Sequence, residues 1–375
     1  MVEFRRIGAV GATETILVNF GPQHPSTHGV LHVMAEISGE QVVAVKPIVG
    51  YLHRGIEKIA ENRTYPQVQV LCDRMDYISA FANEMAYCRA VEKLAGIEVP
   101  ERAEYIRVLF AELVRIASHL IWFGTYANDL GAWTPLLYAM LDREYILDFF
   151  EETAGSRMMP NYFRFGGVRE DLPEGLLEKV HKYIDDYFFK QLDDYEGLIS
   201  GNEIFISRTK GINPITTEQA IEWGLTGPIL RATGVPRDLR KDDPYSIYDK
   251  LDFNVCTAEG GDCFARYRVR MDEMRESAQM ILQVIEKMPD GEIRSKVPKV
   301  LKPPEGEAYV RTESPRGELG VYVVSDGSNK PYRVHFRSPA YINLSALPRM
   351  AIGWKVADMI AIIGSVDIVL GEVDR

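Results

Sequence analysis

Cysteine is scarce in this chain of 375 residues, and its four cysteines form no C-x-x-C pair. A chain of this length can bury a large core without disulfides, so scattered thiols suit a reducing compartment. Cys256 and Cys263 lie seven positions apart with no third or fourth ligand nearby. Because a structural metal site needs about four ligands, the sequence predicts that this chain binds no metal.

Positive charge is in deficit: 43 lysines and arginines face 54 aspartates and glutamates, which gives a formal net charge of -11. Nucleic-acid binding requires a basic footprint, and attraction to anionic lipid requires basic clusters. The charge balance therefore argues against nucleic acid as a partner and against membrane adhesion by charge alone.

Long apolar runs are also missing. The two best candidates for a membrane span are 350–370, which carries a lysine and two aspartates, and 119–140, which carries Asp129. A spanning helix needs about 20 predominantly apolar residues, so both segments are predicted to be buried core. The first twenty residues show no signal-peptide pattern. We therefore expect any attachment to a membrane to depend on a partner.

Nucleotide-binding and hydrolase motifs are absent too. The glycine-rich stretches at 165–168 and 226–228 match neither G-x-G-x-x-G nor G-x-x-x-x-G-K-[ST], so both are interpreted as turns. No H-E-x-x-H or G-x-S-x-G motif occurs. The chain is therefore predicted to bind no NADH, flavin or nucleotide itself.

The hydrophobic pattern predicts sheet near both ends of the chain and helices between them, which is an α+β architecture. We expect a β-rich segment at 1–50, a helical core at 51–288, a proline-rich linker at 289–308 and a β segment with a buried tail at 309–375. These segments are expected to interlock in one domain. The N-terminal and late strands are expected to form one antiparallel sheet. The predicted strands are 13–20, 30–37, 41–46, 309–312, 319–324 and 332–337, and the predicted helices are 53–64, 68–94, 101–123, 134–153, 174–198 and 261–288.

Three groups of residues could carry chemistry. His24 and His28 lie on a loop held by two prolines and could donate protons near neutral pH, or could simply bond the main chain. Arg74-Met75-Asp76-Tyr77 interrupts an otherwise apolar predicted helix, and Tyr77 offers a phenolic proton. The alternative there is an internal salt bridge that fixes packing.

The third group is His119, at the end of a predicted helix, with Asp129 just past it. An aspartate within reach of a histidine raises its proton affinity and orients its ring. The alternative for Asp129 is a cap on the next segment.

Together these stretches resemble the quinone-site large subunit of NADH:quinone oxidoreductase, respiratory complex I, and its relatives in deazaflavin-linked and ferredoxin-linked complexes. The resemblance covers nearly the whole chain and keeps the motif order. The matching stretches are GPQHPSTHGVL at 21–31, GYLHRGIEKIAENRTY at 50–65, DRMDY at 73–77, EKLAGI at 92–97, SHL at 118–120, DLGA at 129–132, GDCFARYRVR at 261–270, RGELGVYVVSDGS at 316–328 and VADMIAIIGSVDIVLGEVDR at 356–375.

The family is homologous to nickel-iron hydrogenase large subunits, which implies a hydrogenase-like fold. Hydrogenases hold their metals with R-x-C-G-x-C near the start and D-P-C-x-x-C-x-x-H at the end. Here the four metal-binding cysteines are replaced by Asp76, Ser79, Val369 and Glu372. Thiolates select such soft metals, so their loss implies an empty, partly apolar pocket suited to a quinone ring.

The resemblance also implies residue roles. Tyr77 and His28 would contact the quinone headgroup and supply protons, with Asp129 paired to His28 and His119 in the same polar group. Met75 and Val369 would form pocket walls. Arg54 and Arg74 would approach the terminal iron–sulfur cluster, which belongs to a neighbouring small subunit.

The substrate implied is ubiquinone or menaquinone, and the partners implied are the iron–sulfur small subunit, other peripheral-arm subunits and membrane-arm subunits. The chain would be held at the cytoplasmic side of the cell membrane, where quinone reduction is coupled to proton translocation. The linker at 289–304 is shorter than in many members, which leaves NADH, a deazaflavin or a ferredoxin open as donor. Tyr126 stands where some members have a histidine near the cluster. A hydrogenase-type large subunit and a scaffold with an inactive pocket are the alternatives.

Overall fold

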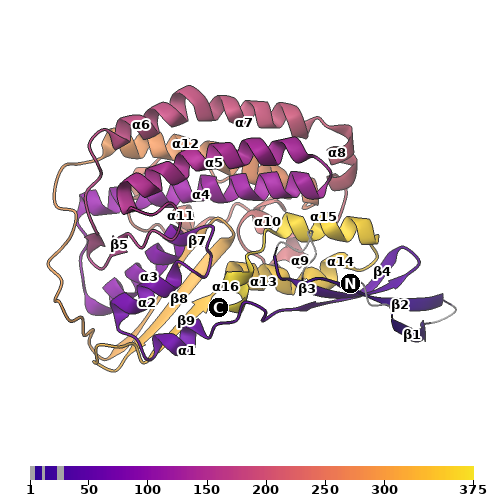
Figure 1. The fold of residues 1–375 in the computed structure, drawn as a ribbon, viewed down its shortest axis with the longest axis horizontal. Coiled ribbons are helices and arrows are strands. Elements are labelled where there is room, and N and C mark those ends of the chain that lie inside the picture. The colour runs from indigo at the N-terminus through magenta and orange to yellow at the C-terminus, as the bar shows by residue number, and fades with distance from the viewer. Residues whose placement is uncertain (1–4, 11–12, 23–28) are drawn as a thin grey trace.

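The computed structural model describes residues 5–10, 13–22 and 29–375 (Figure 1). Long helices form one layer, and two separate antiparallel sheets and the C-terminal helices lie along its other side. The strands are β1 Arg5–Val10, β2 Thr13–Phe20, β3 His32–Ser38, β4 Gln41–Ile48, β5 Phe163–Arg164, β6 Gly167–Val168, β7 Gly306–Ser314, β8 Gly317–Ser325 and β9 Arg333–Arg337.

Helices account for most of the regular structure of the described chain. In chain order they are α1 Ile56–Ala60, α2 Tyr65–Cys72, α3 Ala80–Ala95, α4 Glu101–Asp129, α5 Trp133–Ala154, α6 Leu176–Lys182, α7 Phe189–Tyr195, α8 Glu203–Thr209, α9 Thr217–Glu222, α10 Pro228–Arg231, α11 Leu239–Asp242, α12 Cys263–Lys287, α13 Pro339–Ser345, α14 Leu347–Ala351, α15 Val356–Val366 and α16 Leu370–Asp374. Two π-helical turns, Tyr183–Phe188 and Glu196–Ser200, follow α6 and α7, and a 3-10 turn covers Tyr248–Lys250.

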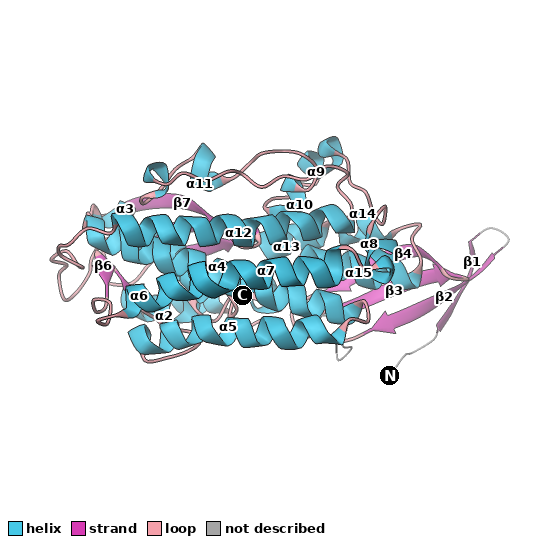
Figure 2. Cartoon of the chain, turned by 90° about the horizontal axis from the view of Figure 1, so that it is seen from above, coloured by secondary structure: helices cyan, strands magenta, loops and turns pink. Residues whose placement is uncertain are grey.

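The centre of the helical layer is α4, which packs against α5 on one side and α12 on another (Figure 2). Nearly every residue of α4 from Tyr105 to Phe123 is buried, which a helix wrapped on several sides requires. Gly124 permits the close approach of α5, because a Cβ there would lie 2.9 Å from the Cα of Leu136. The predicted α12 is confirmed with its cap, since the Asp262 side chain accepts a hydrogen bond from the Ala265 N–H.

The α+β class is confirmed, but the strands from the two ends of the chain do not share a sheet. One sheet has the order β1-β2-β3-β4 and another has the order β7-β8-β9. The two ends of the chain instead meet through isolated pairing, Gln41 with Lys355, and through α14 packed on β4. Alternation predicts that a segment is a strand but does not say which strand will be its neighbour.

The predicted helix at 68–94 is wrong in its middle. α2 ends at Cys72 and α3 begins at Ala80, so residues 73–79 form an irregular turn. The Oδ1 atom of Asp76 accepts hydrogen bonds from the N–H groups of Ile78 and Ser79, both at 3.2 Å. An aspartate that bonds the main chain ahead of it competes with helix formation, which explains the break. The predicted helix at 53–64 is likewise reduced to α1, which has five residues.

The C-terminal tail is buried, as its composition predicts. α15 and α16 bury most of their residues, and the indole N–H of Trp122 on α4 donates to the Gly364 carbonyl at 2.8 Å. Among the described helices, none is both long and apolar enough to cross a membrane.

Candidate functional site

The turn at 73–79 lies against the C-terminal helix α16. Gly371 marks the contact, because a Cβ at that position would lie 2.5 Å from the Met75 carbonyl oxygen and 3.1 Å from two ring carbons of Tyr77. Only glycine allows the main chain to approach this closely. The contact brings the Tyr77 ring, which is half-buried, beside the last residues of the chain.

Arg316 links the two sequence segments that the resemblance relates to the hydrogenase metal motifs. Its Nη1 atom lies 2.5 Å from Oδ2 of Asp76, and its Nη2 atom lies 3.4 Å from Oδ1 of Asp367. Asp367 also faces Arg270, whose Nε is 3.8 Å from Oδ2. All four side chains are buried. The space beside Asp76 is therefore occupied by a guanidinium rather than left as an empty pocket.

The four positions at which the resemblance implies a lost hydrogenase cysteine lie in these same two segments, and all four residues are buried. Val369 is the N-cap of α16, and Glu372 on that helix accepts a hydrogen bond from the Ala340 N–H at 3.2 Å. Asp76 and Ser79 come from the turn. Carboxylates, a hydroxyl and an isopropyl group thus stand where a soft metal would need thiolates.

Burial controls the protonation of this group. Desolvation and the nearby Asp76 raise the pKa of Glu372 to about 8, which Arg316 only partly offsets. Burial also raises the pKa of Asp76, against the opposing effect of Arg316. The pKa of the Tyr77 phenol is raised by burial and by the Asp76 charge. Tyr77 is therefore neutral near pH 7 and holds a proton that it can donate.

The crevice at Tyr77 is small. It encloses about 10 Å³ and is lined by Tyr77 with Arg143, Leu147, Met158 and Met159, among others. That is room for about one water molecule. This crevice, as the described residues form it, is too small to hold a quinone ring.

His119 has a partner that sequence reasoning missed. Its Nε2 atom lies 2.9 Å from Oε2 of Glu273 on α12, and both residues are buried. Burial lowers the pKa of His119, and the hydrogen bond to Glu273 opposes this change. The suggestion that Asp129 reaches His119 is wrong. Both lie on α4, ten residues apart, which separates them by about 15 Å along the helix.

Asp129 ends α4 and is half-buried beside the start of α5. Its expected partner His28, together with His24, lies outside the described residues. The pairing of Asp129 with His28 therefore stays a prediction.

Arg54 and Arg74 are brought together. The Nη2 atom of Arg54 approaches the Arg74 carbonyl oxygen at 3.5 Å, and the Nη1 atom of Arg74 donates to the Val70 carbonyl at 2.7 Å. Arg54 is exposed, and its N–H donates to the carbonyl of Arg375. Met75, between these arginines and Tyr77, is fully buried. Positive charge is thus gathered at the surface next to the turn.

Arg316 is the site residue that the sequence analysis left without a role. It is the first residue of the RGELGVYVVSDGS motif, so the sequence already marked it as a candidate site residue. Its partner Asp76 is 240 residues away, a separation over which sequence gives no pairing rule. Among the described residues, no group of three or more histidines, cysteines or acids could hold a metal ion.

The fold and the site indicate the class of protein to which the chain is related. Residues 54–128, which contain the turn and most of α4, match the family described as nickel-dependent hydrogenase. This is the part of the chain in which the replaced cysteine positions Asp76 and Ser79 lie. This part of the chain is thus similar to the nickel-dependent hydrogenases.

The particular family follows from the rest of the chain. Residues 129–304 and 296–375 match the family described as respiratory-chain NADH dehydrogenase, 49 Kd subunit. The chain is 53% identical over 362 residues to the D subunit of NADH-quinone oxidoreductase from Desulforamulus reducens, covering 96% of this chain and 99% of that protein. The corresponding proteins from Dehalococcoides mccartyi and Geobacillus thermodenitrificans are 54% and 52% identical, with 97% and 96% of this chain and 99% of each relative covered. The chain belongs to the 49 kDa subunit family of complex I.

Proposed function

We propose that this chain forms, with an iron–sulfur small subunit, the site at which a respiratory complex reduces and protonates quinone. The observation that carries the proposal is the packing of the Tyr77 turn against α16, which holds a neutral phenol beside the altered hydrogenase positions. The relatives are named as subunits of NADH-quinone oxidoreductase, which supports quinone as substrate.

Tyr77 supplies one proton in this proposal, and His28 with its partner Asp129 supplies the other. A reduced quinone is negatively charged, and negative charge in a water-poor site is costly until it is protonated. The crevice that the described residues form at Tyr77 is too small to enclose the ring. In this proposal the neighbouring small subunit closes the site around the substrate.

Arg54 and Arg74 face the terminal iron–sulfur cluster of that small subunit. An exposed guanidinium next to the turn places positive charge where the partner docks. Positive charge near a cluster favours its reduced form, so these arginines raise its reduction potential. Electrons then pass from the cluster to the quinone beside Tyr77.

Proton translocation follows from the charge left behind when the site donates its protons. The buried charges that act on Tyr77 are Asp76 and Arg316, and Arg316 is paired with both Asp76 and Asp367. A new negative charge on Tyr77 perturbs this group and so reaches α12 through Arg270. Peripheral-arm and membrane-arm subunits use this change, on the cytoplasmic side of the membrane.

The test is quinone reduction by membranes that carry Tyr77→Phe, with reduction of the terminal cluster followed separately by electron paramagnetic resonance. Removing the phenolic proton should lower quinone reduction at least tenfold and leave cluster reduction unchanged. Tyr332→Phe is the matched control, because Tyr332 is 67% exposed and lies outside the turn.

His28→Ala should give the same pattern as Tyr77→Phe. Wild-type quinone reduction in both variants would mean that quinone is reduced elsewhere and that the chain is a scaffold with an inherited fold. Loss of cluster reduction as well would place the defect upstream of this site.

A further inference from the structure

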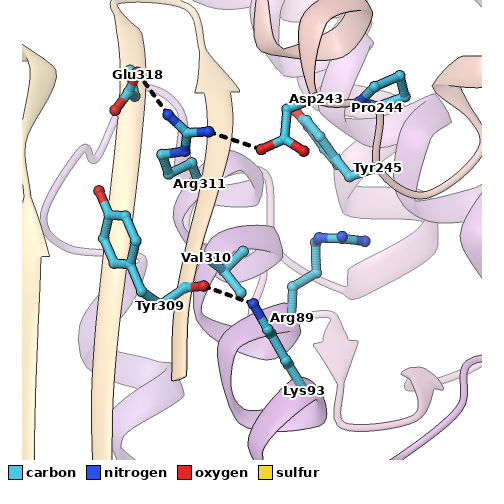
Figure 3. Close-up of a pocket in the computed structure, with 9 residues that line it drawn as sticks. All are labelled: Arg89, Lys93, Asp243, Pro244, Tyr245, Tyr309, Val310, Arg311 and Glu318. Atoms are coloured by element: carbon cyan, nitrogen blue, oxygen red, sulfur yellow. Dashed lines mark hydrogen bonds and ion pairs between the residues drawn. The ribbon is translucent and has the colours of Figure 1, made fainter. Parts of the chain in front are cut away.

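A cleft of about 630 Å³ lies away from the Tyr77 turn, between β7, α3 and the segment that follows α11 (Figure 3). Arg89 and Lys93 reach it from α3, and Tyr309 and Arg311 reach it from β7. Asp243 and Tyr245 form the opposite wall. The Tyr77 site uses none of these residues.

The cleft follows an open edge of a sheet. β7 is the edge strand of the order β7-β8-β9, and its pairing partner β8 lies on one side only. On the cleft side, the Tyr309 carbonyl accepts from Lys93 at 3.1 Å and the Glu313 N–H donates to the Tyr245 hydroxyl at 3.1 Å. Hydrogen-bonding direction alternates along an antiparallel strand, so the N–H and C=O of Arg311, midway between them, also point into the cleft. Outside the ladder with β8, neither main-chain group of Arg311 has a hydrogen-bond partner among the described residues.

The cleft has an excess of positive charge. Arg311 already faces Asp243 at 2.9 Å and Glu318 at 3.9 Å. Arg89 and Lys93 form no ion pair with any described residue, and the Arg89 guanidinium lies 4.9 Å from the Tyr245 ring centre. The lining holds three cations and two carboxylates, so the cleft is locally positive in a chain whose net charge is -11.

We propose that this cleft binds an extended, acidic segment of a partner subunit, which pairs with β7 at Arg311 and sets a carboxylate against Arg89. Unpaired strand edges are the standard docking surface for an added strand, whose main chain supplies the hydrogen bonds. A guanidinium stacked on a ring is held in place to bind a carboxylate with two hydrogen bonds. A small free anion would satisfy the cations but not the strand edge, so a peptide fits both features. The inference rests on the cleft alone and holds whether or not quinone is reduced at Tyr77.

The test is photo-crosslinking in the purified, assembled complex, with p-benzoylphenylalanine in place of Tyr309. Mass spectrometry should identify a crosslink to a partner segment that contains aspartate or glutamate within a few residues. The same group in place of Tyr332, which is exposed outside the cleft, should not label that segment. A crosslink to a segment without acidic residues, to a second copy of this chain, or to no protein overturns the proposal.

The charge requirement is tested in the same experiment with Arg89→Gln and Lys93→Gln together. The crosslink yield should fall at least fivefold, while Lys190→Gln, at an exposed lysine outside the cleft, should leave it unchanged. Arg89→Lys keeps the charge but loses the two hydrogen bonds of the guanidinium. Its crosslink yield should therefore lie between that of the unchanged chain and that of the double variant. An unchanged yield in the double variant shows that the segment is not held by these cations and overturns the proposal. Activity at Tyr77 is a separate measurement, so this outcome leaves the quinone site untouched.

Discussion

Arg316 decides how the site is held together at the scale of single residues. It bonds Asp76 and Asp367 from two segments that are far apart in sequence, and all three are buried. A buried ion pair contributes little net stability relative to apolar packing, but removing one partner leaves an uncompensated charge. The arrangement is therefore sensitive to the loss of any one member.

Arg316→Gln should lower the free energy of unfolding by about 3–5 kcal/mol, because Asp76 is left buried without its cation. Urea unfolding of the purified chain, followed by tryptophan fluorescence, measures the change. Arg333→Gln is the control. The Arg333 side chain, which pairs with Glu57, is 42% exposed. The loss in free energy of unfolding should therefore stay within about 1 kcal/mol. Equal losses in the two variants would show that Asp76 is not held by Arg316.

Glu372 makes stability depend on pH. Its folded pKa of about 8 lies above the ordinary value of 4.5, so the folded chain holds a proton that the unfolded chain releases between these values. The stability that this proton supplies is complete below pH 4.5 and is lost as pH rises through 8. Glu372→Gln cannot ionise, so its stability relative to wild type should increase from pH 5 to pH 8.5.

The change with pH should amount to a few kcal/mol, since one pKa unit is worth about 1.4 kcal/mol. Thermal unfolding at the two pH values measures it. Ser79→Ala, in the same buried group but without a titrating side chain, should show no such change. A Glu372→Gln variant whose relative stability is the same at both pH values would mean that Glu372 is ionised in the folded chain.

Two short elements define the site at the scale of secondary structure. The turn at 73–79 exists because Asp76 bonds the main chain and stops the helix, and α16 lies against it because Gly371 has no side chain. Neither element would hold its shape alone. α16 has five residues, and helices this short depend on tertiary packing.

Gly371→Ala should disturb the turn, since its Cβ would lie 2.5 Å from the Met75 carbonyl oxygen. Forcing atoms into a packed site typically costs about 1–3 kcal/mol, and the shift should displace Tyr77 and lower quinone reduction in membranes. Gly197→Ala is the control, because a Cβ there meets nothing within 4 Å and the residue lies in a helical turn. That change should be neutral or stabilise by about 0.5–1 kcal/mol. Full activity and stability in Gly371→Ala would show that the two segments are not in close contact.

At the scale of the whole molecule, buried ionic contacts join the helical layer to the β7–β9 sheet. Arg231 on α10 contacts Glu273 on α12 and Glu313 on β7, each at 2.7 Å. Glu273 in turn binds His119 on α4. The other members are Glu112, Arg115, Asp238 and Arg240. Such a network fixes the relative positions of the elements that surround the site.

The purified chain should not reduce quinone from any donor, although it should bind its folded partners. The described residues enclose only about 10 Å³ at Tyr77, and the chain is proposed to receive its electrons from a cluster in a neighbouring protein of the complex. The measurement is quinone reduction by the isolated chain with NADH, a reduced deazaflavin or reduced ferredoxin, beside membranes that hold the whole complex. Turnover by the isolated chain above the rate of a heat-inactivated sample would contradict this expectation.

Sequence alone determined the structural features that depend only on residues close together along the chain. The helical period of α4, the Asp262 cap of α12, the alternating strands and the buried tail are all local patterns, and the motif order indicated the family that the comparisons confirmed. The tertiary structure decided the pairings: Arg316 with Asp76, His119 with Glu273, two separate sheets, and an open edge on β7. These contacts join residues up to 240 positions apart, and a charge or a strand edge accepts any suitable partner that the folded chain brings to it. Local patterns therefore fix elements, whereas the choice of partner is made only when the whole chain packs.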